Sequence, residues 1–401
     1  MRKKLLLLLM SIFLVGMLAA CGGSTTGGGN SSSGSDSGSD SGDSDTIKIG
    51  LNFELSGPVA SYGSSDAEGA EFAIEEINAN GGILGKKIEV IKQDNKSETQ
   101  EAVAIATRLT SQDKVLAIIG SATSGNTIAQ VQIANDTKTL LLTPSGTAPN
   151  VTENEDGSIN EYVFRTSYID PFQGTVAANF ALDELGVKTA AIYNDNASDY
   201  AKGLADAFRE TFEAGGGTIV AEESYVAGDT DFRSTLTNIK SANPEFIFIP
   251  GYYEEVGLIV KQARELDITV PLMGADGWDS PKIVELAGAE NLNNTFITNH
   301  YSSQDPDSKI QDFVKNFEEK YGKSPDSFNA LGYDTVYFLA DAIERAGNTD
   351  PEAIKKALEE TENLELVTGT ITIDEKHNPV KSATILEYKD GEQTFRTKVD
   401  P

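Results

Sequence analysis

The sequence predicts an α/β protein with two successive lobes, each a doubly wound parallel sheet covered by helices. From Thr46 onward, short apolar runs alternate with amphipathic segments, and the alternation restarts after a polar insert at 150–161. Several short runs are wholly apolar, which is typical of strands covered on both faces of a parallel sheet. With 401 residues, the chain is long enough for about two to three domains.

The first block of the pattern runs to about residue 144. We expect strands at 47–53, 87–93, 115–120 and 140–144, and helices at 62–80, 97–112 and from about 125. The first of these helices would place Ala70, Ala73 and Ile77 on one face, and the Gly81-Gly82 pair would end it. The segment from Ser97 to Gln100 fits a capping box that would open the second helix.

The second block covers residues 170–274. We expect helices at 170–185, 200–214, 231–241 and 254–266, and strands at 189–193, 217–225, 245–250 and 270–274. The C-terminal third follows another pattern, with long helices at 306–321 and 328–346 and strands near 366–373 and 382–388. Pattern alone does not assign this third to either lobe.

The first 45 residues are typical of an export signal and a tether. Basic residues at 2–4 precede an apolar run at 5–20, which is short for a membrane span and suits a signal peptide. Cys21, the only cysteine, follows small residues, and this arrangement resembles the lipobox of bacterial lipoproteins. An ordinary signal peptide with an incidental cysteine is the alternative. Residues 22–45, with eight Gly and nine Ser, predict a flexible coil.

Composition excludes several classes of function. The formal charge of −30 repels phosphate backbones, so nucleic acid is not an expected partner. One cysteine and two histidines argue against a disulfide, a thiolate cluster and most histidine-rich metal sites, and we expect no metal or cofactor. The chain lacks the Gly-x-Ser-x-Gly, His-Glu-x-x-His and Walker A motifs. His300 and His377 have no evident Ser or Cys partner, so we expect them to be structural or solvated, and we expect no enzyme.

Open α/β sheets bind ligands beyond the carboxyl ends of their strands, so the loops after the expected strands are the candidate site. Ser124 and Thr147 lie in such loops and could donate to an anion beside a helix N-terminus. Asp276, in the second block, could pair with an ammonium. Each also has a plain alternative as a helix cap or a turn residue. Four aromatic residues could be wall residues of an apolar or aromatic chamber, or core residues: Tyr62, Tyr200, Tyr252 and Trp278.

Motifs spread over the whole of 46–401 carry a family resemblance. They are LSGPVASYG (55–63), EGAEFAIEEINANGGILGKKIEV (68–90), IIGSATSGNT (118–127), LLTPSGTAP (141–149), FRTSYIDPFQG (164–174), YNDNASDYAKGLA (193–205), IPGYYEEVG (249–257) and LMGADGW (272–278). In these segments the chain resembles type I solute-binding proteins of ABC transporters. The nearest group is the leucine/isoleucine/valine-binding proteins.

The resemblance implies a two-lobed clamp in which the chain crosses a hinge three times. Lobe 1 would then hold 46–166 with 300–380, and lobe 2 would hold 167–299 with 381–401. By the same resemblance, the ligand carboxylate would meet Ser124, Thr147 and backbone amides of the first lobe. Its ammonium would meet the backbone carbonyl of Ser145 and the carboxylate of Asp276. Aromatic positions of the family's pocket match Tyr62, Tyr200, Tyr252 and Phe328.

The sequence also departs from the branched-chain group. Asp276 stands where Glu is usual and is one methylene shorter, and Ser145 stands where Ala is usual. The disulfide that some relatives carry in the first lobe is absent, because Cys21 is the only cysteine. Trp278 adds bulk near the pocket, so an aromatic or small polar amino acid stays open as the ligand.

We therefore expect an extracytoplasmic, lipid-anchored and monomeric binding protein. It would capture an amino acid, branched-chain in the first instance, by hinge closure and deliver it to the permease of an ABC importer. The alternative is a ligand-sensing, receptor-type binding protein for another amino acid or a small amide. Because such a chain would normally continue into a membrane span or signalling domain, the end at Pro401 favours the importer component.

Overall fold

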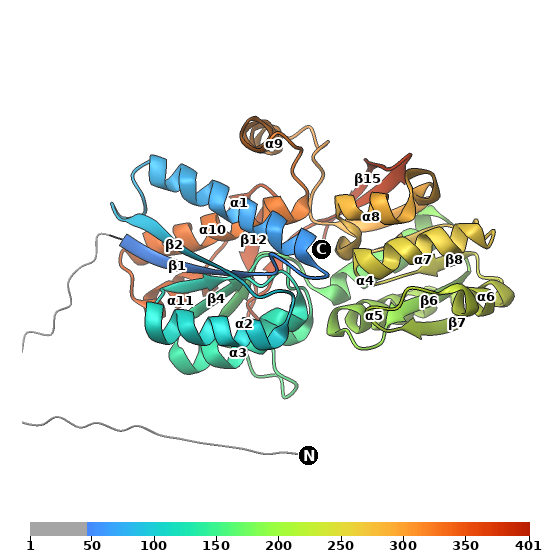
Figure 1. Cartoon of the computed structure of the whole chain (residues 1–401), viewed down its shortest axis with the longest axis horizontal. Coiled ribbons are helices and arrows are strands. Elements are labelled where there is room, and N and C mark those ends of the chain that lie inside the picture. Colours follow the sequence, from blue (N-terminus) through green and yellow to red (C-terminus); the bar gives the residue numbers. More distant parts are fainter. Residues whose placement is uncertain (1–45) are drawn as a thin grey trace, which may run out of the picture. The chain divides into compact units, whose positions relative to one another are not determined.

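Two sheets organise the computed structural model, which describes residues 46–401. The first sheet has five strands in the order β2-β1-β3-β4-β5, all parallel, and we call the part built on it lobe 1. The second has seven strands in the order β15-β14-β10-β9-β8-β6-β7 and forms lobe 2 (Figure 1). The expected signal peptide, lipobox and tether lie outside the described residues.

The first four strands of lobe 1 and the helices between them follow the predicted alternation, whereas the fifth strand at Val163–Arg165 was not predicted. Its strands are β1 (Thr46–Phe53), β2 (Lys87–Asp94), β3 (Ala117–Ile119), β4 (Leu140–Thr143) and β5 (Val163–Arg165). The helices between them are α1 (Ala60–Ala79), α2 (Thr99–Arg108) and α3 (Ser124–Thr137). β3 and β4 are buried throughout, as their wholly apolar runs predict.

The predicted capping box before α2 is wrong. The residue before the helix is Glu98, which makes no side-chain capping bond. Ser97 has a φ of 62°, and its hydroxyl donates to the backbone oxygen of Ser56 at 2.8 Å. The serine therefore fastens the loop after β1 instead of capping the helix. The helical segment continues beyond Arg108 as a π-helix over Leu109–Asp113.

Lobe 2 repeats the alternation and then adds antiparallel strands. Its strands are β6 (Thr189–Asp195), β7 (Thr218–Tyr225), β8 (Phe246–Phe248), β9 (Leu272–Gly274), β10 (Thr295–Asn299), β14 (Ala383–Lys389) and β15 (Glu392–Val399). Its helices are α4 (Asp170–Asn179), α5 (Asp199–Ala214), α6 (Arg233–Ala242), α7 (Tyr253–Glu265) and α8 (Pro281–Ala287). β10 pairs parallel with β9 and antiparallel with β14. The strands β10 and β15 and the helix α8 were not predicted from the sequence.

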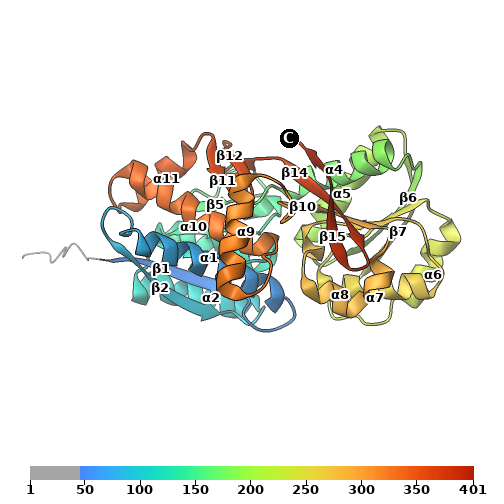
Figure 2. The ribbon, with the colours of Figure 1, turned by 90° about the horizontal axis from the view of Figure 1, so that it is seen from above.

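The C-terminal third contributes to both lobes. It holds α9 (Ser308–Tyr321), α10 (Ser327–Ala346), α11 (Pro351–Glu359), β11 (Leu364–Leu366), β12 (Gly369–Ile373) and β13 (Pro379–Val380). α10 packs tightly along α1, because a Cβ at Gly332 would lie 2.1 Å from the backbone oxygen of Asp66. The chain then returns to the second sheet as the β14–β15 hairpin (Figure 2).

The chain therefore passes between the lobes three times: after β5, after β10, and between β13 and β14. This confirms the predicted class of two α/β lobes with a three-crossover hinge. The exact lobe boundaries given above stay a prediction. No helix within residues 46–401 is both long enough and apolar enough to span a bilayer.

Candidate functional site

A small, narrow cavity with an interior volume of about 10 Å³ lies between the two lobes. Lobe 1 and the C-terminal third contribute Tyr62, Ala122, Thr123, Ser124, Ser145 and Phe328, and lobe 2 contributes Tyr200, Tyr252, Asp276 and Gly277. The lining thus includes every predicted ligand-binding residue except Thr147 and Trp278. The strand-end loops of the two sheets meet here, as the position of ligand sites in open α/β sheets suggests.

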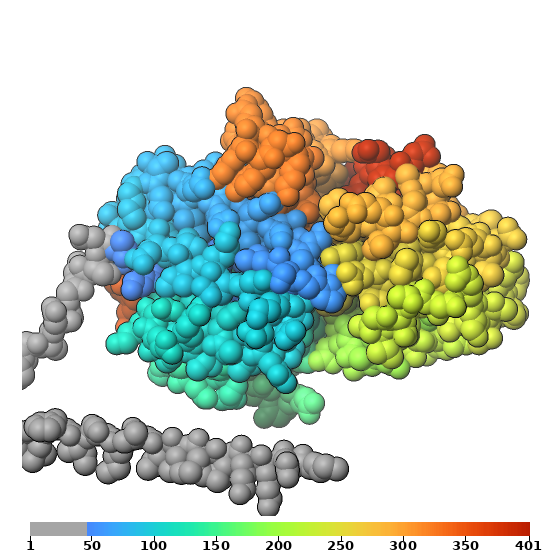
Figure 3. All heavy atoms as spheres, in the orientation of Figure 1, coloured from blue at the N-terminus to red at the C-terminus, as the bar shows by residue number. Residues whose placement is uncertain are grey.

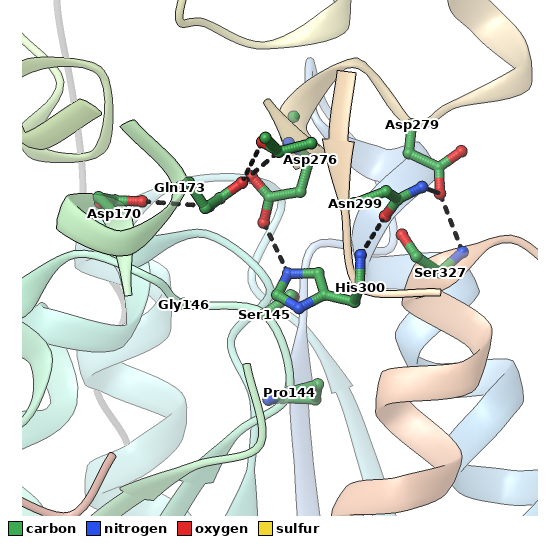
Figure 4. A network of polar contacts seen from close by, with 12 residues as sticks. Pro144, Ser145, Gly146, Asp170, Gln173, Asp276, Asp279, Asn299, His300 and Ser327 are labelled. Atoms are coloured by element: carbon green, nitrogen blue, oxygen red, sulfur yellow. Dashed lines mark hydrogen bonds and ion pairs between the residues drawn. The ribbon is translucent and has the colours of Figure 1, made fainter. Parts of the chain in front are cut away.

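Asp276 is the acidic group of the lobe 2 face. It opens the 3₁₀ turn η4 (Asp276–Trp278) after β9 and is buried. The Tyr200 hydroxyl donates to its Oδ1 at 2.7 Å, and the Gln173 amide donates to the same atom at 3.2 Å. The Nε2 of His300 lies 3.0 Å from its Oδ2 (Figure 4). A carboxylate offers about four lone-pair positions, so these three contacts leave one on Oδ2 for a ligand.

Burial fixes the protonation of two of these partners. It raises the pKa of Tyr200 well above the ordinary value, and the charge of Asp276 raises it further. Burial lowers the pKa of His300, against an opposing effect of Asp276. Both groups are therefore neutral at pH 7 and act as hydrogen-bond donors. Of the side chains of Asp276, Tyr200, Gln173 and His300, only that of Asp276 therefore brings a negative charge to the lobe 2 face.

Sequence reasoning missed Gln173 and His300. Gln173 lies in the first turn of α4, and its Oε1 also accepts from the Thr298 hydroxyl at 3.0 Å. Gln173 lies at the start of a predicted helix and within the 164–174 motif, and this position could have identified it as a site residue. His300, expected to be structural or solvated, is buried against Asp276. It gave no signal because β10, the strand it follows, was not predicted.

The lobe 1 face offers hydrogen-bond donors. Ser124 is the first residue of α3, and its hydroxyl oxygen accepts from the Ala148 N–H at 3.1 Å, which leaves its own hydrogen to donate. The first N–H groups of a helix have no partner inside it, and the helix dipole favours an anion there. Glu54, which the sequence analysis did not single out, accepts from the backbone N–H groups of Ala122 at 3.0 Å and Thr123 at 3.1 Å. It fixes the loop that leads into α3.

Ser145 is linked to a second buried acid of lobe 1. Its Oγ lies 2.6 Å from Oδ2 of Asp66 and 3.0 Å from the backbone oxygen of Ala122. Burial raises the pKa of Asp66 well above its ordinary range, and the charge of Glu54 adds to this effect. The Ser145 hydroxyl donates to Asp66, so the two side chains are held together in lobe 1.

Two predicted residues lie elsewhere. Thr147 is buried and absent from the cavity lining, and its hydroxyl has no hydrogen-bond partner among the described residues. Trp278 is fully buried in the core of lobe 2, and its indole N–H donates to the backbone oxygen of Ile249 at 2.9 Å. The indole lies so close to Gly274 that a Cβ there would be 2.0 Å from its Nε1. Trp278 therefore supports the turn that carries Asp276 from behind and contributes no wall surface.

Aromatic rings form a continuous row across the cavity. Phe328 stacks on Tyr62 with ring centroids 4.6 Å apart, and Tyr62 meets Tyr252 edge-on at 5.6 Å. Tyr252 in turn stacks on Tyr200 at 5.1 Å. The row starts on α10 and ends on α5, so it joins the two lobes. Such rings provide a large apolar surface and keep polar hydroxyl ends for hydrogen bonds.

Several direct hydrogen bonds also join the lobes, and we call them the bridging contacts. The Tyr62 hydroxyl donates to the backbone oxygen of Gly277 and accepts from the Tyr253 N–H at 2.9 Å. Farther along the same edge, the hydroxyls of Ser61 and Ser280 are 2.7 Å apart. In Figure 3 the blue atoms of the segment after β1 touch the yellow atoms of lobe 2. The cavity is thus enclosed by protein on both sides.

Within residues 46–401 there is no group of three or more His, Cys, Asp or Glu side chains that could hold a metal ion. The polar groups of the cavity are instead one carboxylate, hydroxyls and a helix N-terminus. These groups suit an organic ligand that carries a positive and a negative end.

Comparison with known proteins gives a consistent result. The family model described as "Periplasmic binding protein" matches residues 46–393. A leucine-, isoleucine-, valine-, threonine- and alanine-binding protein of Pseudomonas aeruginosa is 32% identical over 355 residues, which cover 88% of this chain and 92% of that protein. The Leu/Ile/Val-binding protein of Escherichia coli is 30% identical over 334 residues, which cover 82% of this chain and 87% of that protein.

Solved structures agree. The leucine-binding protein LivK of Thermotoga maritima superposes with a TM-score of 0.84 at 36% identity, over 88% of this chain and 99% of that one. LivJ of Streptococcus pneumoniae, solved in complex with isoleucine, gives 0.83 at 42% identity, over 89% and 100%. A solute-binding protein of R. palustris in complex with benzoate gives 0.79 at 25% identity, over 89% and 97%.

Proposed function

Because the chain belongs to the periplasmic binding protein family, we propose that it captures an α-amino acid between its lobes for an ABC importer, with leucine, isoleucine and valine as the expected ligands. The observation that carries this proposal is the pairing of Asp276 on one lobe with the N-terminus of α3 on the other across one cavity. An α-amino acid carries an ammonium and a carboxylate on one carbon and matches such a pair. Capture requires binding only, and no catalytic step is part of the proposal.

The ammonium would bind Asp276 through the remaining position on Oδ2, with the backbone carbonyl of Ser145 as a second acceptor. The carboxylate would bind the Ser124 hydroxyl and the first N–H groups of α3. The Thr147 hydroxyl, which has no hydrogen-bond partner among the described residues, would be a further donor to the carboxylate. Charge-assisted hydrogen bonds at both ends would fix the orientation of the ligand.

The side chain of the ligand would pack against the aromatic row. The rings of Tyr62, Tyr252 and Phe328 supply apolar surface beside the polar groups. Burial of a leucine-sized side chain contributes about 1.5–3 kcal/mol. The names of relatives that bind leucine, isoleucine and valine support this choice.

We further propose that the lobes, 46–166 with 300–380 and 167–299 with 381–401, close on the ligand at the three crossovers. Ligand contacts with both faces favour the closed arrangement because the open one offers only half of them. The bridging contacts would form on closure and break on opening. The closed protein would then dock as a monomer on the membrane permease of the importer.

The proposed anchor is Cys21, as a lipidated N-terminus after removal of the signal peptide. Cys21→Ser should release the protein from membranes into the soluble fraction, because the lipid chains provide the membrane affinity. Cell fractionation with an antibody to the folded part measures this. Membrane association that persists in the variant contradicts lipidation.

Calorimetry with matched ligands tests the function. Residues 22–401 without the cysteine, refolded to remove carried-over ligand, should bind leucine, isoleucine or valine and gain thermal stability by mass action. Two control ligands each lack one charged group of leucine. 4-Methylpentanoate lacks the ammonium, and 3-methylbutylamine lacks the carboxylate. Binding of leucine without binding of either control supports the proposal. Binding of an aromatic acid such as benzoate, with no amino acid bound, would refute it.

The alternative is a sensor of another amino acid or a small amide. It would bind a different member of the same ligand panel with higher affinity than the branched-chain set. The benzoate-bound relative with this fold shows that the same architecture holds other ligands.

A further inference from the structure

His300 lies at the second passage of the chain between the lobes, directly after β10. It is buried, and its Nε2 is 3.0 Å from Oδ2 of Asp276. Its ring stacks on Tyr168, with centroids 3.9 Å apart and an angle of 22° between the planes. Tyr168 belongs to the first passage, between β5 and α4. The imidazole is therefore held between one hinge segment and the acid of the cavity.

The backbone of His300 is also held in place. Its N–H donates to the side-chain oxygen of Asn299 at 2.8 Å, and the Asn299 amide donates to Asp279 at 2.9 Å (Figure 4). The same oxygen of Asp279 accepts from the N–H of Ser327, at the start of α10, at 3.0 Å. Since both the backbone and the ring are fixed, the direction of the Nε2–H bond is fixed as well.

The contact also sets the tautomer of the ring. An ionised carboxylate only accepts hydrogen bonds, so the proton of the neutral imidazole must lie on Nε2. Nδ1 has no hydrogen-bond partner among the described residues. The histidine therefore delivers one directed, charge-assisted hydrogen bond, and that bond ends on Asp276.

Resting on the proposed function, we propose that His300 is a positioning residue for recognition of the ligand ammonium, because it fixes the second oxygen of Asp276. Tyr200 and Gln173 both bind Oδ1, and a carboxylate held at one oxygen only can still turn about its Cβ–Cγ bond. The contact from His300 to Oδ2 stops this rotation. The remaining lone pair of Oδ2 is then directed at the cavity before the ligand arrives.

His377 provides a matched control within the same chain. It is buried and stacks on Phe164 with centroids 4.1 Å apart. Its Nδ1 lies 2.9 Å from the backbone oxygen of Val163, inside lobe 1 and not on the cavity lining. Removal of either imidazole deletes a buried, stacked ring. Only removal of His300 also releases Asp276.

The test uses the variants His300→Ala, His300→Gln and His377→Ala, with leucine affinity from calorimetry. His300→Ala should weaken binding roughly ten- to a hundredfold, the range expected for one hydrogen bond to a charged group. His300→Gln should recover most of the affinity, because its amide can donate in place of Nε2. His377→Ala should bind leucine within about twofold of the wild type, even if its melting temperature falls.

A second measurement needs no ligand. With only two histidines, the imidazole ¹⁵N spectrum of the protein can be assigned directly. At pH 7, His300 should show a protonated Nε2 and an unprotonated Nδ1. The opposite tautomer would overturn the proposal.

The measurements separate the positioning role of His300 from the proposed function. If the wild type binds leucine and His300→Ala binds it equally well, the positioning role is wrong and the proposed function stands. An equal loss in His300→Ala and His377→Ala would also overturn the role, since it would reflect stability alone. If the wild type binds no amino acid, the proposed function is wrong and the role of His300 falls with it.

Discussion

The two lobes meet the cavity with opposite chemistry. Lobe 1 presents the Ser124 hydroxyl and the N-terminus of α3, whereas lobe 2 presents the carboxylate of Asp276. Lobe 1 has buried acids as well, but they are engaged elsewhere. Glu54 binds backbone N–H groups of the loop before α3, and Asp66 is held by Ser145. The number of acids near a cavity thus says little about the charge that the cavity presents.

Under the proposed function, the two faces would hold opposite charges of an amino acid: the carboxylate on lobe 1 and the ammonium mainly on lobe 2. Only lobe 2 would supply a counter-charge to the ammonium, so full binding would require the two faces to come together. Asp276 is held by three donors, and this preorganisation lowers the cost of ordering the site when the ligand binds. Four changes test the contrast between the faces, from the largest expected effect to the smallest.

Removal of the acid of lobe 2 should have the largest effect. Asp276→Ala leaves the ligand ammonium without its counter-charge, and loss of one partner of a buried ion pair costs about 3–5 kcal/mol. Leucine affinity should fall roughly a hundred- to several-thousandfold, as measured by calorimetry. The matched control is Asp183→Ala, an exposed acid of lobe 2, which should bind like the wild type. Equal binding by Asp276→Ala and the control would refute the ammonium site.

Removal of the donor of lobe 1 should have a smaller effect. Ser124→Ala deletes one hydrogen bond to the ligand carboxylate but leaves the N–H groups of α3, so we expect a loss of roughly tenfold. Calorimetry with leucine measures it, with Ser111→Ala, at an exposed serine of lobe 1, as the control. The site of the carboxylate is wrong if the two variants bind leucine alike.

Tyr62→Phe tests the contact between the faces. The ring still stacks on Phe328, but the bonds to Gly277 and from Tyr253 are lost. Closure becomes less favourable by about 1 kcal/mol, so leucine affinity should fall roughly fivefold. Small-angle scattering should show a larger radius of gyration for the variant at subsaturating ligand.

The control for this test is Tyr193→Phe. Tyr193 is a buried tyrosine whose aromatic neighbours, Tyr225 and Phe232, belong to lobe 2. It should change neither the affinity nor the scattering. If it changes both as much as Tyr62→Phe does, loss of a buried hydroxyl explains the effect and the bridging contacts do not.

The smallest effect concerns pH. Burial, with the charge of Asp279 second, raises the pKa of Asp326 to about 7. Asp279 belongs to lobe 2, whereas Asp326 caps α10, which packs on lobe 1. Opening of the lobes would separate the two acids and lower the pKa of Asp326, so the closed form would bind more protons near neutral pH. Leucine affinity should therefore fall roughly two- to fivefold from pH 6 to pH 8.

Asp326→Asn tests this pH dependence. Asparagine caps a helix about as well as aspartate and carries no charge, so the variant should bind leucine with a flatter profile between pH 6 and pH 8. Calorimetry at matched ionic strength gives the comparison. An unchanged slope in the variant would assign the pH effect to another group.

Much of the fold follows from local patterns, and the exceptions have physical reasons. β3, β4 and β8 are fully buried and wholly or almost wholly apolar, so the sequence predicted them. β10 is equally buried, but its sequence TFITN contains two threonines and an asparagine whose polar groups are satisfied inside the protein. A pattern of apolar residues cannot reveal a strand of this kind.

Some residues of the site could likewise be predicted from the sequence, and others could not. The position of loops after strands was enough to single out Ser124, Tyr252 and Asp276. Trp278 was misleading because it follows Asp276 in sequence, while its side chain turns into the core towards Ile249. Gln173 lies 103 positions from Asp276 along the chain, and only the folded structure brings the two together.

The bridging contacts have a consequence for how ligands are told apart. They join protein to protein, so they contribute the same free energy for every ligand that lets the lobes meet. They raise all affinities together and cannot rank leucine against valine, because selectivity is a difference between affinities. The order of ligand affinities would depend on the residues of the cavity wall, which would contact the ligand. A substitution at Ser61 or Ser280 should therefore change the affinities for all ligands by the same factor. The order of those affinities should change only when a residue of the cavity wall is substituted.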